Sequence, residues 1–305
     1  MKRRQAWGYF WENRLWDLQR HRKRLYTCGI VLAGVLVVAV LLTQLILPSI
    51  RYAQAKNKLE TGDYAGAVRI FKDLRSFRDS DTYTSRYSLL AVEPGDVVRF
   101  GSFEQDGNLE NGPEPIEWIA LKTEGDHVYL LSKYLLENMS YSANFGMATW
   151  DTSGIREWLN SEFYNEAFTD EERSAIMLTH NEASTNERYP DMPAGEDTDD
   201  HLFLLSLYEV REFFPDDNDK YATATEYAVQ NGARVLPETG FSWWWTRTVG
   251  ANRTLAAAVH GQTQVVFDVA DFYGCNVNNN EGCVRPVMWV DADAYAKLIT
   301  PQNEE

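Results

Sequence analysis

The chain has 305 residues, of which 44% are hydrophobic and 13% aromatic, and its net charge is −16 at pH 7. This apolar content is enough for a packed core, so the composition excludes a disordered chain. The first 24 residues hold eight Lys and Arg residues against two acidic ones, which leaves the remainder at about −22. Such an acidic body repels phosphate backbones, so nucleic acid is excluded as a partner.

Residues 26–47 form an uncharged apolar stretch, YTCGIVLAGVLVVAVLLTQLIL. At about 1.5 Å per residue it spans the roughly 30 Å of a bilayer core, which predicts one transmembrane helix over residues 25–48. The basic segment at residues 20–24 predicts a cytoplasmic N-terminus and an extracytoplasmic body on a bacterial cell membrane. The alternative is a cleaved signal peptide with a small-x-small site at residues 53–55. Such peptides have a shorter apolar region, of about 7 to 15 residues.

The predicted cytoplasmic tail, residues 1–24, is too short to fold as a domain. Trp7, Trp11, Leu15 and Leu18 recur in it at helical spacing among basic residues. This pattern predicts an interfacial helix on anionic membrane lipid. A binding site for a cytoplasmic partner is the alternative.

Residues 51–90 carry apolar faces for two helices that break at Gly62 and Asp63. Together with Gly62, the spacing of Tyr64, Ala67 and Phe71 resembles one tetratricopeptide repeat, in which the small residue lets two helices approach. A lone repeat cannot bury its own faces. We therefore expect a helical-hairpin stalk that packs on the next domain or on a second copy of the chain.

Residues 91–300 alternate strands, turns and short helices, and residues 301–305 form a tail. Strands before and after a run of short helices predict an α+β domain whose first and last strands share one antiparallel sheet. Three helix starts carry capping boxes: Thr169 with Glu172, Ser206 with Glu209, and Thr223 with Glu226. The predicted strand segments are GDVVRFGSF, a hairpin in IEWIALKTEGDHVYLLS turning at residues 124–126, a hairpin in LAAAVHGQTQVVF about Gly261, and CVRPVMWV.

Three consecutive tryptophans, Trp243, Trp244 and Trp245, stand in the segment GFSWWWTRTVG. In a strand, the first and third point to one face and the second to the other. Each indole can bury roughly 200 Å², so both faces must be covered. The segment is either a central core strand or an aromatic platform that binds a sugar or a peptide.

The segment WWWTRTVG (residues 243–250), with VRPVMWV (residues 284–290) after it, resembles a family of bacterial extracytoplasmic domains of unknown function. That family's hallmark is W-W-L-R-S-P-G followed by V-R-P-A-L-W-I, and a membrane helix or small helical repeats often precede it. The chain departs from the hallmark at Thr246, Thr248 and Val249. The resemblance covers residues 93–291 and includes GDVVRFGSFEQD, EPIEWIAL, TWDTSGIREWLNSEFYNEAF and DTDDHLFLLSLYEV.

The layout also resembles the C-type-lectin-like superfamily, whose terminal strands pair and whose late segment carries tryptophans and an arginine. This resemblance implies sugar or protein binding, or the oxidative chemistry of the formylglycine-generating enzymes. Arg247 and Arg285 are either structural, tying carbonyls and carboxylates together or stacking on indoles, or ligands for an anion.

An acidic loop at residues 191–201 contains Asp197, Asp199 and Asp200. Oxygen-rich loops outside the cell often hold calcium, which makes Ca²⁺ the candidate cofactor. The spacing lacks the EF-hand pattern, so a solvated acidic loop is the alternative.

Cys275 and Cys283 lie on either side of an Asn- and Gly-rich turn. In an exported domain this arrangement predicts a disulfide, which would stabilise the fold by about 2 to 3 kcal/mol. The alternative is a copper-binding or redox thiol pair of the formylglycine-generating type. The spacing does not match that motif, and no histidine accompanies the pair in sequence.

The chain contains no H-E-x-x-H, G-x-S-x-G or P-loop motif. We therefore favour a non-catalytic recognition module that binds a cell-wall glycan, a peptide or a partner protein. One alternative is an extracytoplasmic enzyme, either of formylglycine-generating type or a hydrolase. The other is a structural or sensor subunit of a membrane complex, including a homo-oligomer, in which Gly29 and Ala33 allow a close helix contact.

Overall fold

A computed structural model describes residues 26, 30, 32–40, 42–143, 146–261 and 269–299. The chain divides into two compact units, Met1–Thr84 and Ser85–Glu305, which are described separately. The predicted cytoplasmic tail, Gly29 of the predicted helix contact and the tail at residues 301–305 lie outside the described residues.

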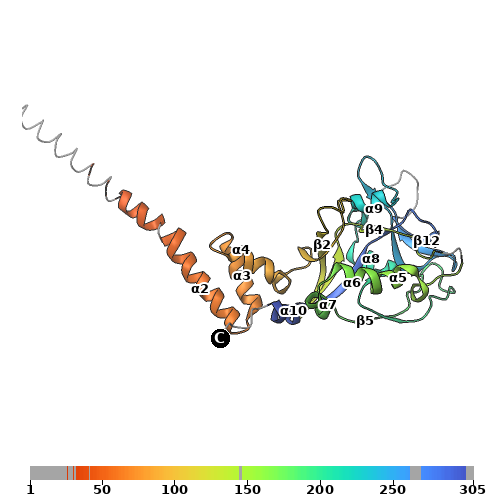
Figure 1. The fold of residues 1–305 in the computed structure, drawn as a ribbon, viewed down its shortest axis with the longest axis horizontal. Helices are drawn as coiled ribbons and strands as arrows, with labels where there is room; N and C mark the ends of the chain where they lie inside the picture. Colours follow the sequence, from red (N-terminus) through yellow and green to blue (C-terminus); the bar gives the residue numbers. More distant parts are fainter. Residues whose placement is uncertain are drawn as a thin grey trace, which may run out of the picture. The chain divides into compact units, whose positions relative to one another are not determined.

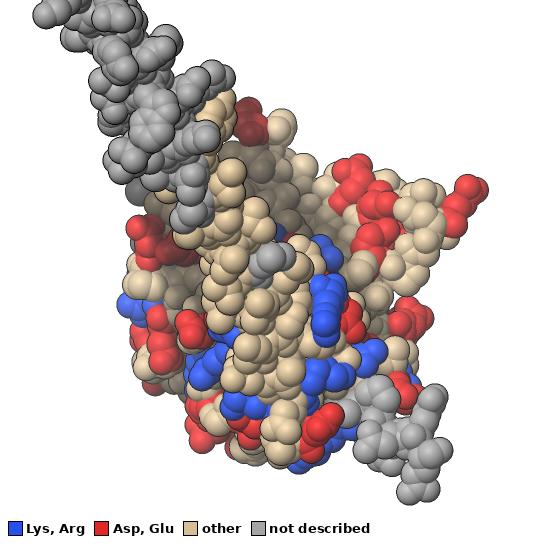
Figure 2. Space-filling view, turned by 90° about the vertical axis from the view of Figure 1, so that its left-hand side faces the viewer, with Lys and Arg blue, Asp and Glu red and all other residues tan. Residues whose placement is uncertain are grey.

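Among its described residues, the first unit has one helix, Leu32–Glu60, that is long and apolar enough to cross a membrane by its length and composition. Its mean hydropathy reaches 2.3, and none of that apolar window is buried. Figure 2 shows its apolar part as an uncharged surface that faces the viewer. A π-helical turn, Leu42–Ile46, precedes α2 (Leu47–Glu60). Pro48 follows this π-helical turn closely. A proline inside a continuous helix removes one backbone hydrogen bond, and local irregularities of the helix are common at such a position.

The predicted helical hairpin is confirmed as α2 followed by α3 (Tyr64–Leu74). Gly62 takes a positive φ of 81° in the turn, and the Asp63 side chain caps α3 by accepting the Gly66 N–H at 2.9 Å. Ala55, Ala67 and Phe71 are fully buried between the helices. A further helix, α4 (Ser80–Arg86), follows in sequence.

In the second unit, the described strands form two larger sheets. The first has the order β1-β2-β3-β14-β7 and is antiparallel throughout. The predicted turn is confirmed, because β2 ends at Glu124, β3 begins at His127, and Gly125 between them has φ 62°. The late strand β14 pairs with β3, so the early and late strands share one sheet as predicted. The bounds are β1 (Val97–Phe103), β2 (Glu114–Glu124), β3 (His127–Ser132), β7 (Phe203–Leu204) and β14 (Pro286–Asp291).

The second sheet has the order β12-β11-β10-β13-β4. Only the short β10–β13 pair is parallel among its described pairings. The predicted final strand is divided, because Arg285 separates β13 in this sheet from β14 in the other. The segment predicted as the far arm of the Gly261 hairpin includes residues 262–267, outside the described residues, and β11 pairs instead with β12. The bounds are β4 (Glu137–Asn138), β10 (Trp244–Val249), β11 (Leu255–Val259), β12 (Ala270–Asn276) and β13 (Cys283–Val284).

Short helices connect and cover the sheets, and α5 and α6 follow one another along one side of the unit (Figure 1). Two predicted capping boxes, at Thr169 and Ser206, are confirmed. The third is wrong, because Thr223 lies in β8 and the Thr225 side chain caps α9 instead. These elements are η2 (Ser88–Ala91), η3 (Trp150–Thr152), α5 (Gly154–Trp158), η4 (Leu159–Phe163), α6 (Tyr164–Ala167), α7 (Asp170–Ala175), β5 (Thr179–Asn181), β6 (Thr198–Asp200), α8 (Leu207–Phe213), η5 (Asp217–Lys220), β8 (Ala222–Thr223), α9 (Glu226–Gln230), β9 (Phe241–Ser242) and α10 (Ala292–Ile299).

Candidate functional site

The three consecutive tryptophans belong to the core of the second unit. Trp244 and Trp245 are 0% exposed and Trp243 is 9% exposed. The Trp244 Nε1–H donates to the Lys220 carbonyl at 3.2 Å, and the Trp245 Nε1–H to the Met139 carbonyl at 3.0 Å. The core-strand interpretation is therefore confirmed. Trp244 and Trp245 present no flat face to solvent, whereas the rim of Trp243 reaches a pocket.

Arg247 and Arg285 tie parts of the fold together. The Arg247 guanidinium pairs with Glu209 at 3.0 Å and donates to the Glu182 carbonyl at 2.9 Å. Arg285 is 2% exposed; its Nε donates to the Ser132 carbonyl at 3.1 Å, and its guanidinium lies 5.1 Å from the Trp244 ring centre. Burial lowers the pKa of Arg285 to about 9. The sequence allowed either a structural or an anion-binding role for both arginines, and these contacts match the structural one.

A cavity of about 270 Å³ opens beside the start of β10. We call it the Trp243 pocket. Its wall combines aromatic rings with charged and polar groups, which is the composition of a site for a small polar ligand. The residues that line it include Arg234, Phe241, Trp243, His260, Cys275, Asn279 and Glu281.

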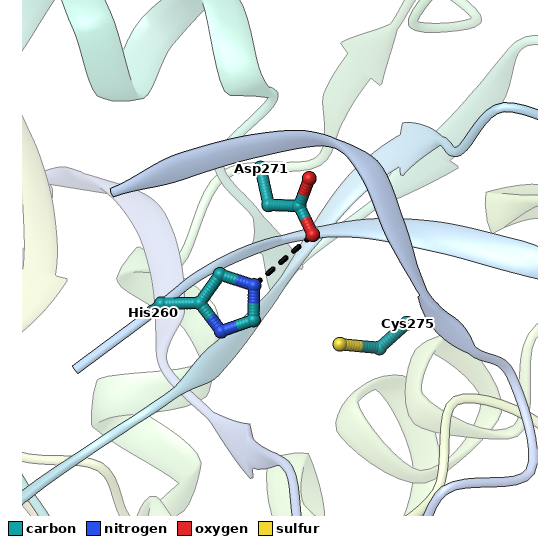
Figure 3. Close-up of side chains that lie close together, drawn as sticks. All are labelled: His260, Asp271 and Cys275. Atoms are coloured by element: carbon teal, nitrogen blue, oxygen red, sulfur yellow. Dashed lines mark hydrogen bonds and ion pairs between the residues drawn. The ribbon is translucent and has the colours of Figure 1, made fainter. Parts of the chain in front are cut away.

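Two of these lining residues belong to a compact group formed by His260, Asp271 and Cys275. One donor atom from each side chain lies within 4.8 Å of the other two. Nε2 of His260 is 3.0 Å from the Asp271 carboxylate oxygen Oδ2. Figure 3 shows the imidazole, the carboxylate and the thiol turned toward one shared space.

The pairing of β11 with β12 brings this group together. Ala256 faces Cys275 and Ala258 faces Asp271, so four steps along β12 match only two along β11. This is a bulge, and Gly274 supplies its positive φ of 90°. A Cβ at Gly274 would lie 2.4 Å from the Ala256 carbonyl oxygen, so the backbone approach needs glycine.

The electrostatics of the group keep the carboxylate charged and the thiol protonated. Burial acts to raise the pKa of Asp271, but hydrogen bonds from His260 and from the Gly274 and Tyr273 N–H groups outweigh it and lower that pKa. Burial, with the nearby Asp271 charge, raises the pKa of Cys275 to about 12. A thiol with that pKa is a weak nucleophile at neutral pH, so the group does not form an activated cysteine.

The predicted disulfide is wrong, since Cys275 and Cys283 are both free thiols. Cys275 lies on β12 and Cys283 on β13, with β11 and β10 between them. Strands three places apart in a sheet are separated by roughly 14 Å, beyond the Cα separation that a disulfide spans. The Cys283 thiol contacts the Ser242 hydroxyl at 3.4 Å instead.

Sequence reasoning missed His260 and Asp271 as neighbours of Cys275. They lie 15 and four residues before it in the chain and match no local ligand motif. The only available signal was the predicted strand pairing in this region, which would have to be combined with the correct register. The structure therefore supplies the histidine that was absent near the cysteines in sequence.

Of the three predicted calcium ligands, Asp197 and Asp199 both lie against the His180 imidazole, at 3.7 and 2.9 Å, whereas Asp200 has other partners. Asp200 is 1% exposed and pairs with the Arg156 guanidinium at 2.6 Å, so it is a structural anchor. Asp199 contacts the exposed imidazole of His180 at 2.9 Å, and Asp197 accepts the Ala183 N–H at 2.8 Å. Because Asp199 and Asp200 are adjacent on β6, they face opposite sides. Among the described residues, the carboxylates that do cluster are Glu104, Asp106 and Glu114, near the β1–β2 turn.

The fold and the pocket define a mixed α+β domain that follows an apolar N-terminal helix. The chain belongs to the family described as Domain of unknown function (DUF6273), whose model matches residues 125–292. That range contains the Trp243 pocket and all three residues of the His260 group. No curated protein and no solved structure gives a significant match to the chain.

Proposed function

We propose that this chain is a membrane-anchored recognition module that binds a cell-wall glycan or peptide in the Trp243 pocket without catalysing a reaction. In this proposal the N-terminus lies in the cytoplasm of a bacterial cell, and a tetratricopeptide-like hairpin forms the stalk. The second unit is a C-type-lectin-like domain displayed outside the cell. The apolar helix Leu32–Glu60 and the basic residues before it support the anchor and its orientation.

The observation that carries the proposal is the composition of the pocket wall. The partly exposed ring of Phe241 offers apolar surface on which a sugar ring or an apolar side chain can pack, and the mostly buried Trp243 borders the same pocket. Arg234 and Glu281 lie 3.6 Å apart and, with Asn279, supply donors and acceptors for hydroxyl or amide groups. About 270 Å³ is just below the range for drug-sized ligands, which favours one sugar ring or one to two amino acids.

The absence of catalysis is supported by the thiol at the pocket wall. Cys275 has a neighbouring histidine and carboxylate, as a cysteine hydrolase would have. However, burial raises the pKa of Cys275 to about 12, whereas activated cysteines have a lowered pKa. In the metal-free protein, a ligand held in this pocket therefore meets a protonated thiol.

The experiment is a binding titration of the full chain in detergent with purified peptidoglycan fragments and a glycan array. We expect Glu281→Gln and Asn279→Ala to weaken binding by about tenfold each, the effect of removing one or two good hydrogen bonds. Trp243→Phe should weaken it by less, because a ring remains at the wall. Tyr208→Ala is the control, because Tyr208 is 63% exposed and lies outside the pocket.

The outcome that contradicts the proposal is equal binding by wild-type protein and by folded Glu281 and Asn279 variants, with melting curves as the check on folding. Binding that depends on none of the pocket residues would move recognition to another surface. Turnover of a fragment by the wild-type protein would contradict the non-catalytic assignment.

A further inference from the structure

The His260 group combines three different donors at the edge of a cavity: an imidazole nitrogen, a carboxylate oxygen and a thiol sulfur. We propose that His260, Asp271 and Cys275 bind a Zn²⁺ ion at the wall of the Trp243 pocket. This inference concerns a metal site, and it does not depend on the glycan or peptide of the proposed function.

The donor chemistry selects the metal. Thiolate sulfur, imidazole nitrogen and carboxylate oxygen are the three ligand types of protein zinc sites. Calcium and magnesium prefer oxygen alone, so one sulfur and one nitrogen ligand argue against both. A hydrogen-bonded pair of His260 and Asp271 alone would need no cysteine beside it, but here the thiol shares the same space (Figure 3).

The geometry is close to that of a bound ion. In tetrahedral zinc sites with bonds of about 2.0 to 2.3 Å, ligand atoms lie roughly 3.3 to 3.8 Å apart. The three donor atoms here lie within 4.8 Å of one another, so small side-chain rotations bring them into range. Asp271 and Cys275 lie on β12, and His260 directly follows β11, where its N–H donates to the Val269 carbonyl at 2.8 Å. These backbone pairings hold the three residues in place.

The carboxylate is already oriented for this role. The Tyr273 N–H donates to Asp271 Oδ1 at 2.9 Å, while Oδ2 faces Nε2 of His260 at 3.0 Å. A backbone donor thus holds one oxygen and leaves the other directed at the shared space. Hydrogen bonds of this kind fix metal ligands in the orientation that binding needs.

Three protein ligands leave the fourth zinc position open. His260 and Cys275 both line the Trp243 pocket, so we place the open position toward that cavity. Structural zinc sites have four protein ligands, whereas an open position is occupied by water or by a bound ligand. The zinc ion would therefore contact whatever enters the pocket.

Binding requires one proton to leave the thiol. The Cys275 S–H bond breaks, a sulfur–zinc bond forms, and the proton passes to solvent. The Nε2–H bond of His260, which donates to Asp271 in the metal-free protein, also breaks: the neutral imidazole takes up its proton on Nδ1 by exchange with solvent and binds zinc through Nε2. No oxidant or reductant is needed. The metal charge stabilises the thiolate that burial alone disfavours.

The test uses Co²⁺ as a spectroscopic substitute for Zn²⁺ in the full chain in detergent. We expect a near-ultraviolet thiolate-to-cobalt absorption band that Zn²⁺ abolishes by displacement. Cys275→Ser should remove this band, and the matched control Cys283→Ser should keep it, because Cys283 lies on a different strand. His260→Asn and Asp271→Asn should each weaken zinc affinity by at least about tenfold.

Folding is monitored by circular dichroism for every variant, and the wild-type result alone is decisive if a variant unfolds. Folded wild-type protein that shows no thiolate–cobalt band and binds no Zn²⁺ would overturn the inference. A band that survives Cys275→Ser would also overturn it. Peptidoglycan binding is measured with Zn²⁺ removed, so its failure is distinguishable from failure of the metal site.

Discussion

Truncation of Trp244 to alanine should destabilise the second unit more than almost any other single change. Its side chain is fully buried, and an indole of roughly 200 Å² at about 25 cal/mol per Å² contributes about 5 kcal/mol. The change also leaves the Lys220 carbonyl without the indole donor and removes the ring against which the Arg285 guanidinium lies. A loss of about 3 to 5 kcal/mol follows, which is a large share of the about 5 to 15 kcal/mol that stabilises a typical domain.

The assay is urea unfolding of the full chain in detergent, followed by circular dichroism. We expect Trp244→Phe to fall between wild type and Trp244→Ala, because it keeps a ring but loses the Nε1–H donor. Tyr208→Ala, at a 63% exposed position, should change the free energy of unfolding by less than about 0.5 kcal/mol. A Trp244→Ala cost below about 1 kcal/mol would refute the assignment of this indole to the core.

Three further predictions follow from single contacts. Because the two described thiols are free, a reductant should leave the melting temperature unchanged; a drop would reveal a disulfide. Gly274→Ala should lower the free energy of unfolding by about 2 kcal/mol or more, because its Cβ would meet the Ala256 carbonyl. The control Gly112→Ala, at a similar positive φ but in open space, should lower it by about 1 kcal/mol. Equal losses in the two variants would argue against the close approach at Gly274. Burial raises the pKa of Glu137 despite a hydrogen bond from Asn231, so stability at this site falls as pH rises from the unfolded-state pKa through the folded one. Glu137→Gln should therefore raise the melting temperature at pH 7 and lose that advantage in acid; an unchanged or lower melting temperature at pH 7 would contradict this.

Local patterns predicted the elements that depend on nearby residues. Gly125 between two apolar segments was enough to predict the hairpin turn. An acidic residue three positions after Thr169 and after Ser206 was enough to predict the two helix caps. The failure at Thr223 has a local cause as well. Thr225 offers the same hydroxyl two residues further on, and pairing of β8 with β9 places Thr223 in a strand.

Relations between distant strands were not readable from the sequence. Cys275 and Cys283 are separated by only seven residues, which suggested a bond, but the chain leaves the edge strand β12 and returns in β13, three places away in the sheet. The approach of His260 to Cys275 depends on a bulge in β12. Neither the strand order nor the bulge is set by residue types close to the cysteines, so the candidate metal site needed the structure.

The position of β14 constrains when the second unit can fold. This strand lies between β3 and β7, yet it is among the last parts of the unit to be synthesised, at Pro286–Asp291. Until it arrives, β3 and β7 each lack a partner, and unpaired edges promote aggregation. The first sheet of a nascent chain therefore remains incomplete until β14 has emerged, and a premature stop before Pro286 would yield a protein that associates with its neighbours rather than a smaller stable domain.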